Sequence, residues 1–398
     1  MMNTVQNLPQ DIVLKIGEFL SDKEKTMFAS ISTKMNQLKF VFIFNDPIHI
    51  LPPAKYGMNY RLRNGKSIDK IFNLPYIKNL KCIKYFSNSN RIPEIVTHLE
   101  FSKTFNENLD KLPKNITHLT FGKRFNKSIK NKIPSSVTNL TFGDNFNRSI
   151  KNNIPHGVKH LKFGDDFNRI IKGNIPPSML TIFFGCEFNQ TIKTSIPFGV
   201  TGLHFGYKFN QSIEGNIPSS VKRLYFDGGF DQPIDNCIPY GVKSLTFGSK
   251  FNHPIKNNIP LTVKYLEFGK EFNQEIKNCI PASVEVLDIC HDFNKPFSDL
   301  PATLEHITLC GSFNRSIDSM RTLKLTSLYI YSIPPFDKSL KNIPATVVDL
   351  RLTKPHQWML NEIPHTVEDL EVTIPQSKQK KDYKFPKWVN LTVKKSKY

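Results

Sequence analysis

Nine Ile-Pro or Leu-Pro dipeptides recur along this chain at a constant interval of 21 residues. A fixed period near 20 residues is typical of solenoids, in which one small supersecondary unit stacks on its neighbours. Such a chain grows by adding units, so a length of 398 residues does not imply several globular domains. The prolines of these dipeptides are Pro113, Pro134, Pro155, Pro176, Pro197, Pro218, Pro239, Pro260 and Pro281.

Each dipeptide precedes the pattern of a short, half-buried strand. In the unit that begins at Pro134, the apolar residues Val137, Leu140 and Phe142 are spaced by three and then two positions. The last three residues of this segment alternate as a strand with one buried face does. Pro134 lacks a backbone donor and fixes its own φ, so it belongs at the turn before the strand. Because the chain returns to the same place in every unit, successive strands are expected to be parallel.

The segment after the strand is expected to close the coil. Gly143 should end the strand with a positive φ, Phe146 should turn inward, and Ile150 should pack on the return side. Asn147 recurs in most units, and a short amide at a fixed turn can bond backbone groups that a sheet leaves unpaired. Stacked copies would form an asparagine ladder. The equivalents of Asn147 are Asn126, Asn168, Asn189, Asn210, Asn252, Asn273, Asn294 and Asn314, with Asp231 as a variant.

The repeat divides the chain into three regions. Residues 5–40 are predicted to be helical, residues 41–91 to be a linker and N-terminal cap with a degenerate repeat, and residues 92–398 to be the solenoid. Within the solenoid, residues 113–300 form the regular core and residues 301–398 carry degenerate and capping repeats, which gives about 14 to 16 units. Irregular end units are expected because terminal repeats must shield the apolar interior.

The charge of the chain could suggest a nucleic-acid-binding protein. Its formal net charge is +20 and its pI is near 9.5. However, Asn, Lys, Ile and Phe are all frequent, which A+T-rich codons would also produce. We therefore interpret the excess lysine as solvated surface, and we do not expect nucleic acid to be the partner.

No secretory or membrane-spanning segment is visible in the sequence. The N-terminus lacks the basic start, apolar run and cleavage site of a signal peptide, and no apolar stretch approaches the roughly 20 residues that span a bilayer. We therefore expect an intracellular protein, in the cytoplasm or the nucleus. Glycosylation-type tripeptides such as Asn126-Lys127-Ser128 recur with the repeat and would stay unmodified there.

Six cysteines do not make a disulfide framework in a chain of this length. Cys237 and Cys279 lie two periods apart. Cys290 and Cys310 occupy one repeat position in neighbouring units, where strands about 4.8 Å apart could bring them together. A regulatory disulfide and buried or half-buried free thiols are both compatible with this spacing. No Cys/His cluster has zinc spacing, so neither a metal nor a cofactor is expected.

The repeat unit of this chain resembles that of a known family. The unit Phe-Gly-x-x-Phe-Asn-x-x-Ile-x-x-x-Ile-Pro-x-x-Val-x-x-Leu-x-Phe resembles the FNIP repeat, a relative of the leucine-rich repeat, over roughly three quarters of the chain. The resemblance implies a curved solenoid with a parallel β-sheet along its concave face. The family is abundant in social amoebae and in giant viruses that infect amoebae, so a viral member would act in the host cell.

Two helices are predicted before the repeats, over residues 8–38. Pro9 suits the first turn of a helix, and Ile12, Ile16 and Leu20 lie at helical spacing on one face. Ser21, with a glutamate three residues later, can cap the second helix. Together with the repeats, these helices give an α+β chain. By pattern alone, they could be a cap that shields the first repeat.

These helices also resemble an F-box, whose consensus begins with a Leu-Pro pair and continues with apolar residues at helical spacing. The direct matches are Leu8, Pro9, Ile12, Ile16 and Leu20, whereas Met35 stands where the family usually has Trp. The resemblance implies that this face docks the Skp adaptor and, through it, a cullin. The repeats would then hold a protein target, which makes the chain the substrate-recognition subunit of an SCF-type E3 ubiquitin ligase. The alternative is a repeat-based interaction scaffold with no ubiquitin-ligase role.

A target would bind where the repeat varies, at the strand positions that flank the inward leucine and phenylalanine. On the concave face these positions include an aromatic and arginine cluster of the kind that protein-binding hot spots use. Its members are Phe183, His204, Arg223, Tyr225 and Tyr265. The alternative is an ordinary solvated sheet face. A second stripe, which begins at Lys130 and Lys151, is expected to be solvated because stacked like charges repel.

An enzyme is not expected. The sequence has no phosphate-cradling glycine loop, no metal cluster and no nucleophile elbow. No catalytic residues are therefore assigned, and function is expected in protein binding.

Overall fold

The computed structural model describes residues 48–50, 83–90, 92, 94, 96–289, 291–332 and 336–396. There the chain is a parallel β-solenoid of about 14 turns that resembles the leucine-rich-repeat fold, with very little helix. The helices predicted over residues 5–40, and with them Leu8, Pro9, Ile12, Ile16 and Leu20, lie outside the described residues. Across the part that is described, no helix is long and apolar enough to cross a bilayer.

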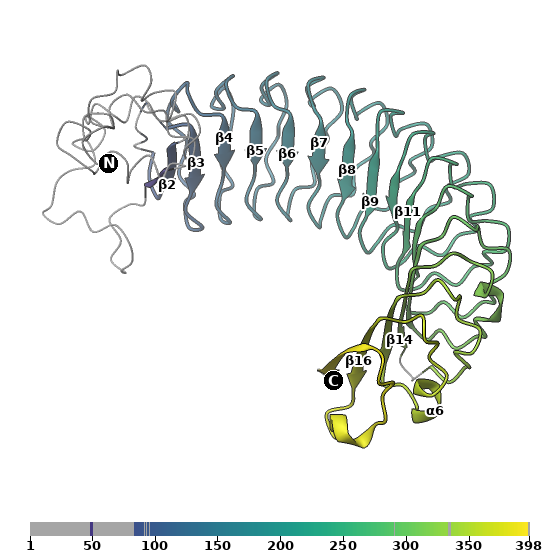
Figure 1. The fold of residues 1–398 in the computed structure, drawn as a ribbon. Helices are drawn as coiled ribbons and strands as arrows, with labels where there is room; N and C mark the ends of the chain where they lie inside the picture. Colours follow the sequence, from purple (N-terminus) through teal and green to yellow (C-terminus); the bar gives the residue numbers. More distant parts are fainter. Residues whose placement is uncertain are drawn as a thin grey trace, which may run out of the picture. The chain divides into compact units, whose positions relative to one another are not determined.

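The chain forms two compact units, residues 1–164 and 165–398, each of which is described by itself. The strands of the first unit are β1 (Ile48–Ile50), β2 (Ile83–Ser87), β3 (His98–Phe101), β4 (His118–Thr120), β5 (Asn139–Thr141) and β6 (His160–Lys162). Figure 1 shows β2 to β6 side by side. Every recorded pairing between them is parallel, as predicted. The register repeats with the sequence, so Leu140 lies opposite Leu119 and Leu161.

The second unit continues the same pattern with longer strands toward its end. Its strands are β7 (Thr181–Phe183), β8 (Gly202–Phe205), β9 (Arg223–Phe226), β10 (Ser244–Thr246), β11 (Tyr265–Phe268), β12 (Val286–Ile289), β13 (His306–Gly311), β14 (Ser327–Ser332), β15 (Asp349–Thr353), β16 (Asp369–Ile374) and β17 (Asn390–Lys395). Among the described residues of this unit, the helical pieces are two 3-10 turns, η3 (Asp318–Met320) and η4 (Lys380–Asp382), and one short helix, α6 (Gln357–Leu360).

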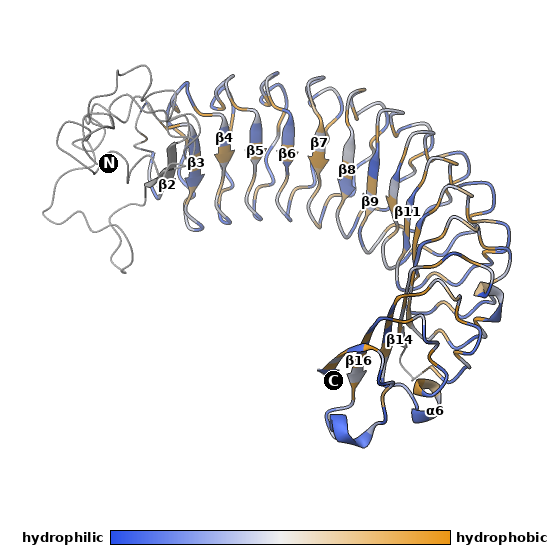
Figure 2. Ribbon diagram, viewed as in Figure 1, coloured by the Kyte–Doolittle hydropathy of each residue, from blue (hydrophilic) through white to orange (hydrophobic). Residues whose placement is uncertain are grey.

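The repeat positions predicted to be inward form the core. Val137, Phe146 and Ile150 have no exposed surface, and Leu140 and Phe142 expose 2% or less. Along the ribbon of each turn of the solenoid, apolar and polar residues alternate (Figure 2). The prediction that Phe146 turns inward and Ile150 packs on the return side is confirmed.

Phenylalanine rings fill the coil as two adjacent columns. Within one turn the rings of Phe142 and Phe146 lie 3.9 Å apart, and each also stacks on its counterpart one turn earlier. Phe121 lies 5.6 Å from Phe142, and Phe125 lies 6.1 Å from Phe146. Because truncating one such ring would open a cavity that its neighbours cannot fill, a Phe→Ala change here costs about 3–5 kcal/mol. The columns therefore explain why phenylalanine recurs at both positions.

The asparagine ladder is confirmed in both units. The backbone N–H of Asn147 donates to the side-chain oxygen of Asn126 at 3.1 Å, and Asn126 is joined in the same way to Asn106. The same bonds recur through the second unit. The first is from the N–H of Asn189 to the side-chain oxygen of Asn168, and the last is from the N–H of Asn314 to that of Asn294. Each side chain thus satisfies a backbone donor of the next turn, which no strand pairing would satisfy.

The prediction for Gly143 is wrong. This residue has no positive φ; instead, a Cβ built there would lie 1.9 Å from the carbonyl oxygen of Gly122. Glycine is needed because two neighbouring turns pass too close for any side chain. The positive φ occurs later in the unit, at a position that Asn152 and Asn257 share with Gly215.

The cysteines that the structure describes are free thiols. Cys237 and Cys279 are buried, and Cys310 is half-buried. Burial raises the pKa of both Cys237 and Cys279. Cys290 lies outside the described residues, so its predicted approach to Cys310 stays a prediction.

Candidate protein-binding face of the sheet

The outer face of the sheet is made by the strand positions that flank the inward residues. In β5 the central Leu140 is buried between Asn139 and Thr141, which are both partly exposed, and β6 and β9 show the same alternation. The lysines predicted to be solvated, such as Lys130 and Lys151, are exposed outside the strands. The outer face is therefore the part of the sheet where side chains can vary without loss of the core.

Three of the predicted target-binding residues form one stacked row. Phe183, His204 and Tyr225 lie opposite one another in the register of β7, β8 and β9. The ring centroids of Phe183 and His204 are 4.2 Å apart, and those of His204 and Tyr225 are 5.5 Å apart. Phe183 and Tyr225 remain 37% and 38% exposed. The aromatic row, as we call these three residues, is thus ordered by its own contacts and still open to solvent.

Arg223 lies beside the aromatic row. Its Nη2 is 3.5 Å from the position where a Cβ of Gly202 would be, so the guanidinium lies across the gap that this glycine leaves. Burial lowers the pKa of His204, and the charge of Arg223 lowers it further. Both effects favour the neutral imidazole, and Arg223 supplies positive charge to this part of the face.

Tyr265 does not join the aromatic row. It lies in the other outer row, opposite Ser244, which itself lies opposite Arg223. Its hydroxyl lies 2.9 Å from Glu267 Oε2 and 2.9 Å from Asp288 Oδ2. Burial and these two carboxylates raise the pKa of Tyr265. Because a phenol carries one proton, Tyr265 can donate to only one of the two carboxylates at a time.

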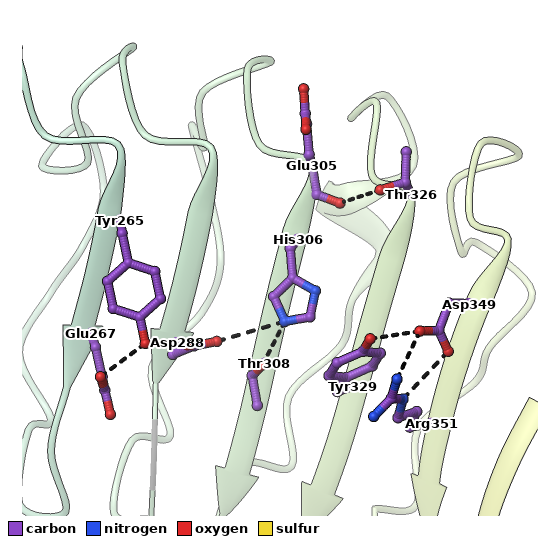
Figure 3. A network of polar contacts seen from close by, with 10 residues as sticks. All are labelled: Tyr265, Glu267, Asp288, Glu305, His306, Thr308, Thr326, Tyr329, Asp349 and Arg351. Atoms are coloured by element: carbon purple, nitrogen blue, oxygen red, sulfur yellow. Dashed lines mark hydrogen bonds and ion pairs between the residues drawn. The ribbon is translucent and has the colours of Figure 1, made fainter. Parts of the chain in front are cut away.

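A polar network continues from Asp288 along the outer face (Figure 3). His306 Nε2 lies 3.7 Å from Asp288 Oδ1 and 2.8 Å from Thr308 Oγ1. The ring of His306 meets the ring of Tyr329 edge-on at 4.4 Å. Burial lowers the pKa of His306, although Asp288 opposes that shift. These side chains therefore link β12, β13 and β14 in addition to the backbone pairing of the same strands.

The far end of the network is an arginine-tyrosine-carboxylate group. Tyr329 donates to Asp349 Oδ2 at 2.5 Å, and Arg351 Nη2 donates to the same oxygen at 3.1 Å. The guanidinium carbon of Arg351 lies 4.1 Å from the centre of the Tyr329 ring, which is a cation–π contact. Burial and Asp349 raise the pKa of Tyr329 to about 12.

Sequence reasoning missed most of this network. It named Tyr265 as an aromatic contact and assigned nothing to Asp288, His306, Tyr329 or Arg351. The signal was present, because each of these residues keeps the offset of an outer-face position. Asp288, Tyr329 and Arg351 directly follow the buried leucine of their strands, and His306 directly precedes the buried Ile307. The units here are 20, 21 and 22 residues apart, which hides that offset from a strict 21-residue count.

The described part of the face offers exposed and half-buried side chains for binding. Among the residues that the structure describes, no group of three or more His, Cys, Asp and Glu side chains could hold a metal ion. The aromatic row with Arg223 suits apolar and acidic side chains, and the carboxylates near Tyr265 suit basic ones. Both belong to the second unit.

Comparison with known proteins agrees with this fold. A family model described as FNIP Repeat matches successive windows that together span residues 87–292, more than half of the chain. The F-box resemblance of residues 8–38 has no such match. No curated protein matches the chain significantly.

Among solved structures, the chain is similar to CroV588, whose crystal structure is described as that of a novel circular leucine-rich-repeat protein. The two are 29% identical with a TM-score of 0.58, over 80% of this chain and 56% of that one. The similarity therefore spans little more than half the length of CroV588. With the repeat positions, the parallel ladder and the family match in agreement, the chain belongs to the FNIP repeat family.

Proposed function

We propose that this chain is an intracellular protein-interaction scaffold, not an enzyme, and that the outer face of its sheet binds a protein partner. The observation that carries the proposal is the aromatic row of Phe183, His204 and Tyr225 with Arg223 beside it. Aromatic and arginine side chains dominate the energetics of protein interfaces, especially when they are held in place before binding.

The charge of the face favours a protein over a nucleic acid. Glu267, Asp288 and Asp349 lie on the outer rows of β11, β12 and β15, in a chain whose net charge is +20. Carboxylates on the binding surface repel phosphate groups, which dominate nucleic-acid affinity. A protein partner can place apolar side chains on the aromatic row and basic ones near Tyr265.

The test is affinity purification with proximity labelling, comparing the full-length chain with Tyr225→Ala and Arg223→Glu. Truncating a hot-spot residue costs about 2 kcal/mol or more, which is roughly 30-fold in affinity. Partners enriched by the unmodified chain should therefore be lost with both variants. Lys130→Glu is the matched control, because it makes the same charge change outside the sheet. If all variants enrich the same proteins equally, the face is not the binding surface.

A finer proposal is that the chain is the substrate-recognition subunit of an SCF-type ubiquitin ligase. It rests on the resemblance of residues 8–38 to an F-box, through Leu8, Pro9, Ile12, Ile16 and Leu20. In this role the N-terminal helices bind a Skp-type adaptor, which links to a cullin, while the sheet face holds the target.

Pull-down of a purified Skp adaptor tests this finer proposal. Leu8→Ala combined with Pro9→Ala should abolish adaptor binding, whereas Lys15→Ala, on the polar side of the predicted helix, should not. Circular dichroism checks that the repeats stay folded. If the adaptor binds neither the unmodified chain nor the variants, the scaffold role stands and the ligase role does not.

A further inference from the structure

A second surface lies at the turn that precedes each strand. The N–H groups of Val200, Val242 and Val263 donate to the carbonyl of the proline three residues earlier, at 3.3, 3.3 and 3.1 Å. The residue directly after each proline is therefore at the tip of a turn. Its side chain cannot reach the core, so the fold places no demand on its chemistry.

In the second unit, three of these tip positions carry large apolar side chains, whereas others carry small ones such as Ser219 and Ala282. Phe198 is 77% exposed, Tyr240 is 73% exposed and Leu261 is 68% exposed. The equivalent residues of the first unit are polar and exposed, namely Lys114, Ser135 and His156. Apolar side chains gathered on one side of a protein, without a role in folding, mark a surface that another molecule covers.

The two aromatic tips are held in a defined conformation. Phe198 and Tyr240 each precede a glycine with positive φ, +114° at Gly199 and +125° at Gly241. The N–H of Gly199 donates to Ser220 Oγ at 3.1 Å, and the N–H of Gly241 donates to Thr262 Oγ1 at 3.0 Å. Each turn is thus fixed by a hydroxyl of the next unit. This lowers the entropy cost of binding at the tips.

Lysines accompany the apolar tips. Lys222 and Lys243 are exposed, and neither pairs with a carboxylate among the residues that the structure describes. The Nζ of Lys222 lies 3.1 Å from where a Cβ of Gly241 would be, which places the ammonium group beside the turn of Tyr240. The partner should therefore carry carboxylates next to its apolar side chains. A second copy of this surface would bring lysines against lysines.

The spacing of the tips suits a helix. Neighbouring units lie about 4.8 Å apart, so Tyr240 and Leu261 are about 4.8 Å apart along the stack, and Phe198 and Tyr240 are about 9.6 Å apart. Along an α-helix, residue i+3 lies about 4.5 Å beyond residue i, and residue i+10 lies about 10.5 Å beyond residue i+3, with all three on one face. Side chains on one face of a strand repeat at about 6.7 Å, which matches neither interval.

We propose that the turn ridge, formed by Phe198, Tyr240, Leu261, Lys222 and Lys243, docks an amphipathic helix of a partner protein. The apolar stripe of that helix, at i, i+3 and i+10, lies on Leu261, Tyr240 and Phe198, and acidic residues beside the stripe pair with the two lysines. This site is separate from the outer face of the sheet and does not depend on the function proposed for that face.

The experiment is selection of a phage-displayed library of single-helix peptides on the full-length chain, followed by fluorescence anisotropy with the selected peptides. The expected peptides have an apolar stripe flanked by Glu or Asp. A triple variant, Phe198→Ser, Tyr240→Ser and Leu261→Ser, should bind them at least about 30-fold more weakly. Serine already occupies this tip position at Ser135 and Ser219, so the variant should fold.

Charge variants complete the test. Lys222→Glu with Lys243→Glu should weaken binding strongly, whereas Lys130→Glu with Lys151→Glu should not. Selection of peptides that bind the triple variant equally, or of none at all, overturns the proposal.

Two other occupants would also overturn it. Phosphatidylcholine vesicles with about 30% phosphatidylserine that sediment the unmodified chain but not the triple variant would identify a membrane surface. A dimer seen by light scattering, and lost in the triple variant, would identify a second copy of this chain.

Discussion

The backbone N–H of Asn210 donates a 3.0 Å hydrogen bond to the side-chain oxygen of Asn189, one unit earlier. The same oxygen accepts a second bond, also of 3.0 Å, from the side-chain amide of Gln211. One short side chain thus joins two turns of the solenoid at a place where the strands do not.

Replacing Asn189 by alanine should destabilise the chain by about 1–2 kcal/mol, because the N–H of Asn210 loses its acceptor. Asn189→Asp should cost less, since an aspartate at the same position, Asp231, accepts the N–H of Asn252. Urea unfolding followed by circular dichroism measures both changes. Gln211→Ala is the control, because it removes the side-chain donor alone and should cost less than about 0.5 kcal/mol. Equal costs for Asn189→Ala and Gln211→Ala would contradict this role of the ladder.

Two glycines with different roles should differ in how much their substitution destabilises the chain. A Cβ at Gly206 would lie 2.1 Å from the carbonyl oxygen of Gly185, so Gly206→Ala should cost about 1–3 kcal/mol by overpacking. Gly215 has a φ of +65° and open space around it, and Asn236 adopts the same conformation one unit later. Gly215→Asn should therefore change stability by less than about 0.5 kcal/mol. The same unfolding experiment compares them, and a neutral Gly206→Ala would show that the turns can move apart.

These glycines show what a periodic sequence can and cannot predict. Recurrence identified Phe146 and Asn147 as architecture, because an identical environment in every turn selects an identical residue. It also marked Gly143 as special, but the assigned cause was local backbone conformation. The real cause is the carbonyl of Gly122 in the adjacent turn, a tertiary contact that one unit viewed alone does not contain.

The candidate site was predictable to a similar degree. The strand offsets correctly placed Phe183, His204 and Tyr225 on the outer face, and the alternation within a strand already puts Tyr265 in the other row. The direction of the Arg223 side chain across Gly202 could not be predicted, because it depends on space that a neighbouring strand leaves open.

The buried cysteines occupy a position that is polar in other units. Cys237 Sγ donates to the carbonyl of Asp235 at 3.2 Å, as Ser195 Oγ does to that of Lys193 at 3.1 Å. Cys237→Ser should therefore keep the bond and change stability by less than about 0.5 kcal/mol. Cys237→Val should cost about 1 kcal/mol, because the donor is lost. Thermal unfolding separates the two, and equal melting temperatures would show that the thiol bond contributes nothing.

Because of the network at β14 and β15, the free energy of unfolding should fall as the pH rises above about 10. The pKa of Tyr329 is raised to about 12 from an ordinary value of 10.0, by burial and by Asp349. As the pH rises, the unfolded chain therefore loses this proton first, which favours unfolding. The stabilising contribution of Tyr329 is complete below about pH 10 and is lost progressively between about pH 10 and 12.

Tyr329→Phe should flatten this dependence. The midpoint of urea unfolding, measured at intervals from pH 9 to pH 11, should fall more steeply for the unmodified chain than for the variant. Absorbance at 295 nm, taken as the difference between the two chains, follows the titration of the single phenol. Asp349→Asn should lower the pKa of Tyr329, while burial keeps that pKa above its ordinary value. If the difference titration instead centres near pH 10 in the unmodified chain, Tyr329 neither is buried nor donates to Asp349 in solution, and the network does not join these strands.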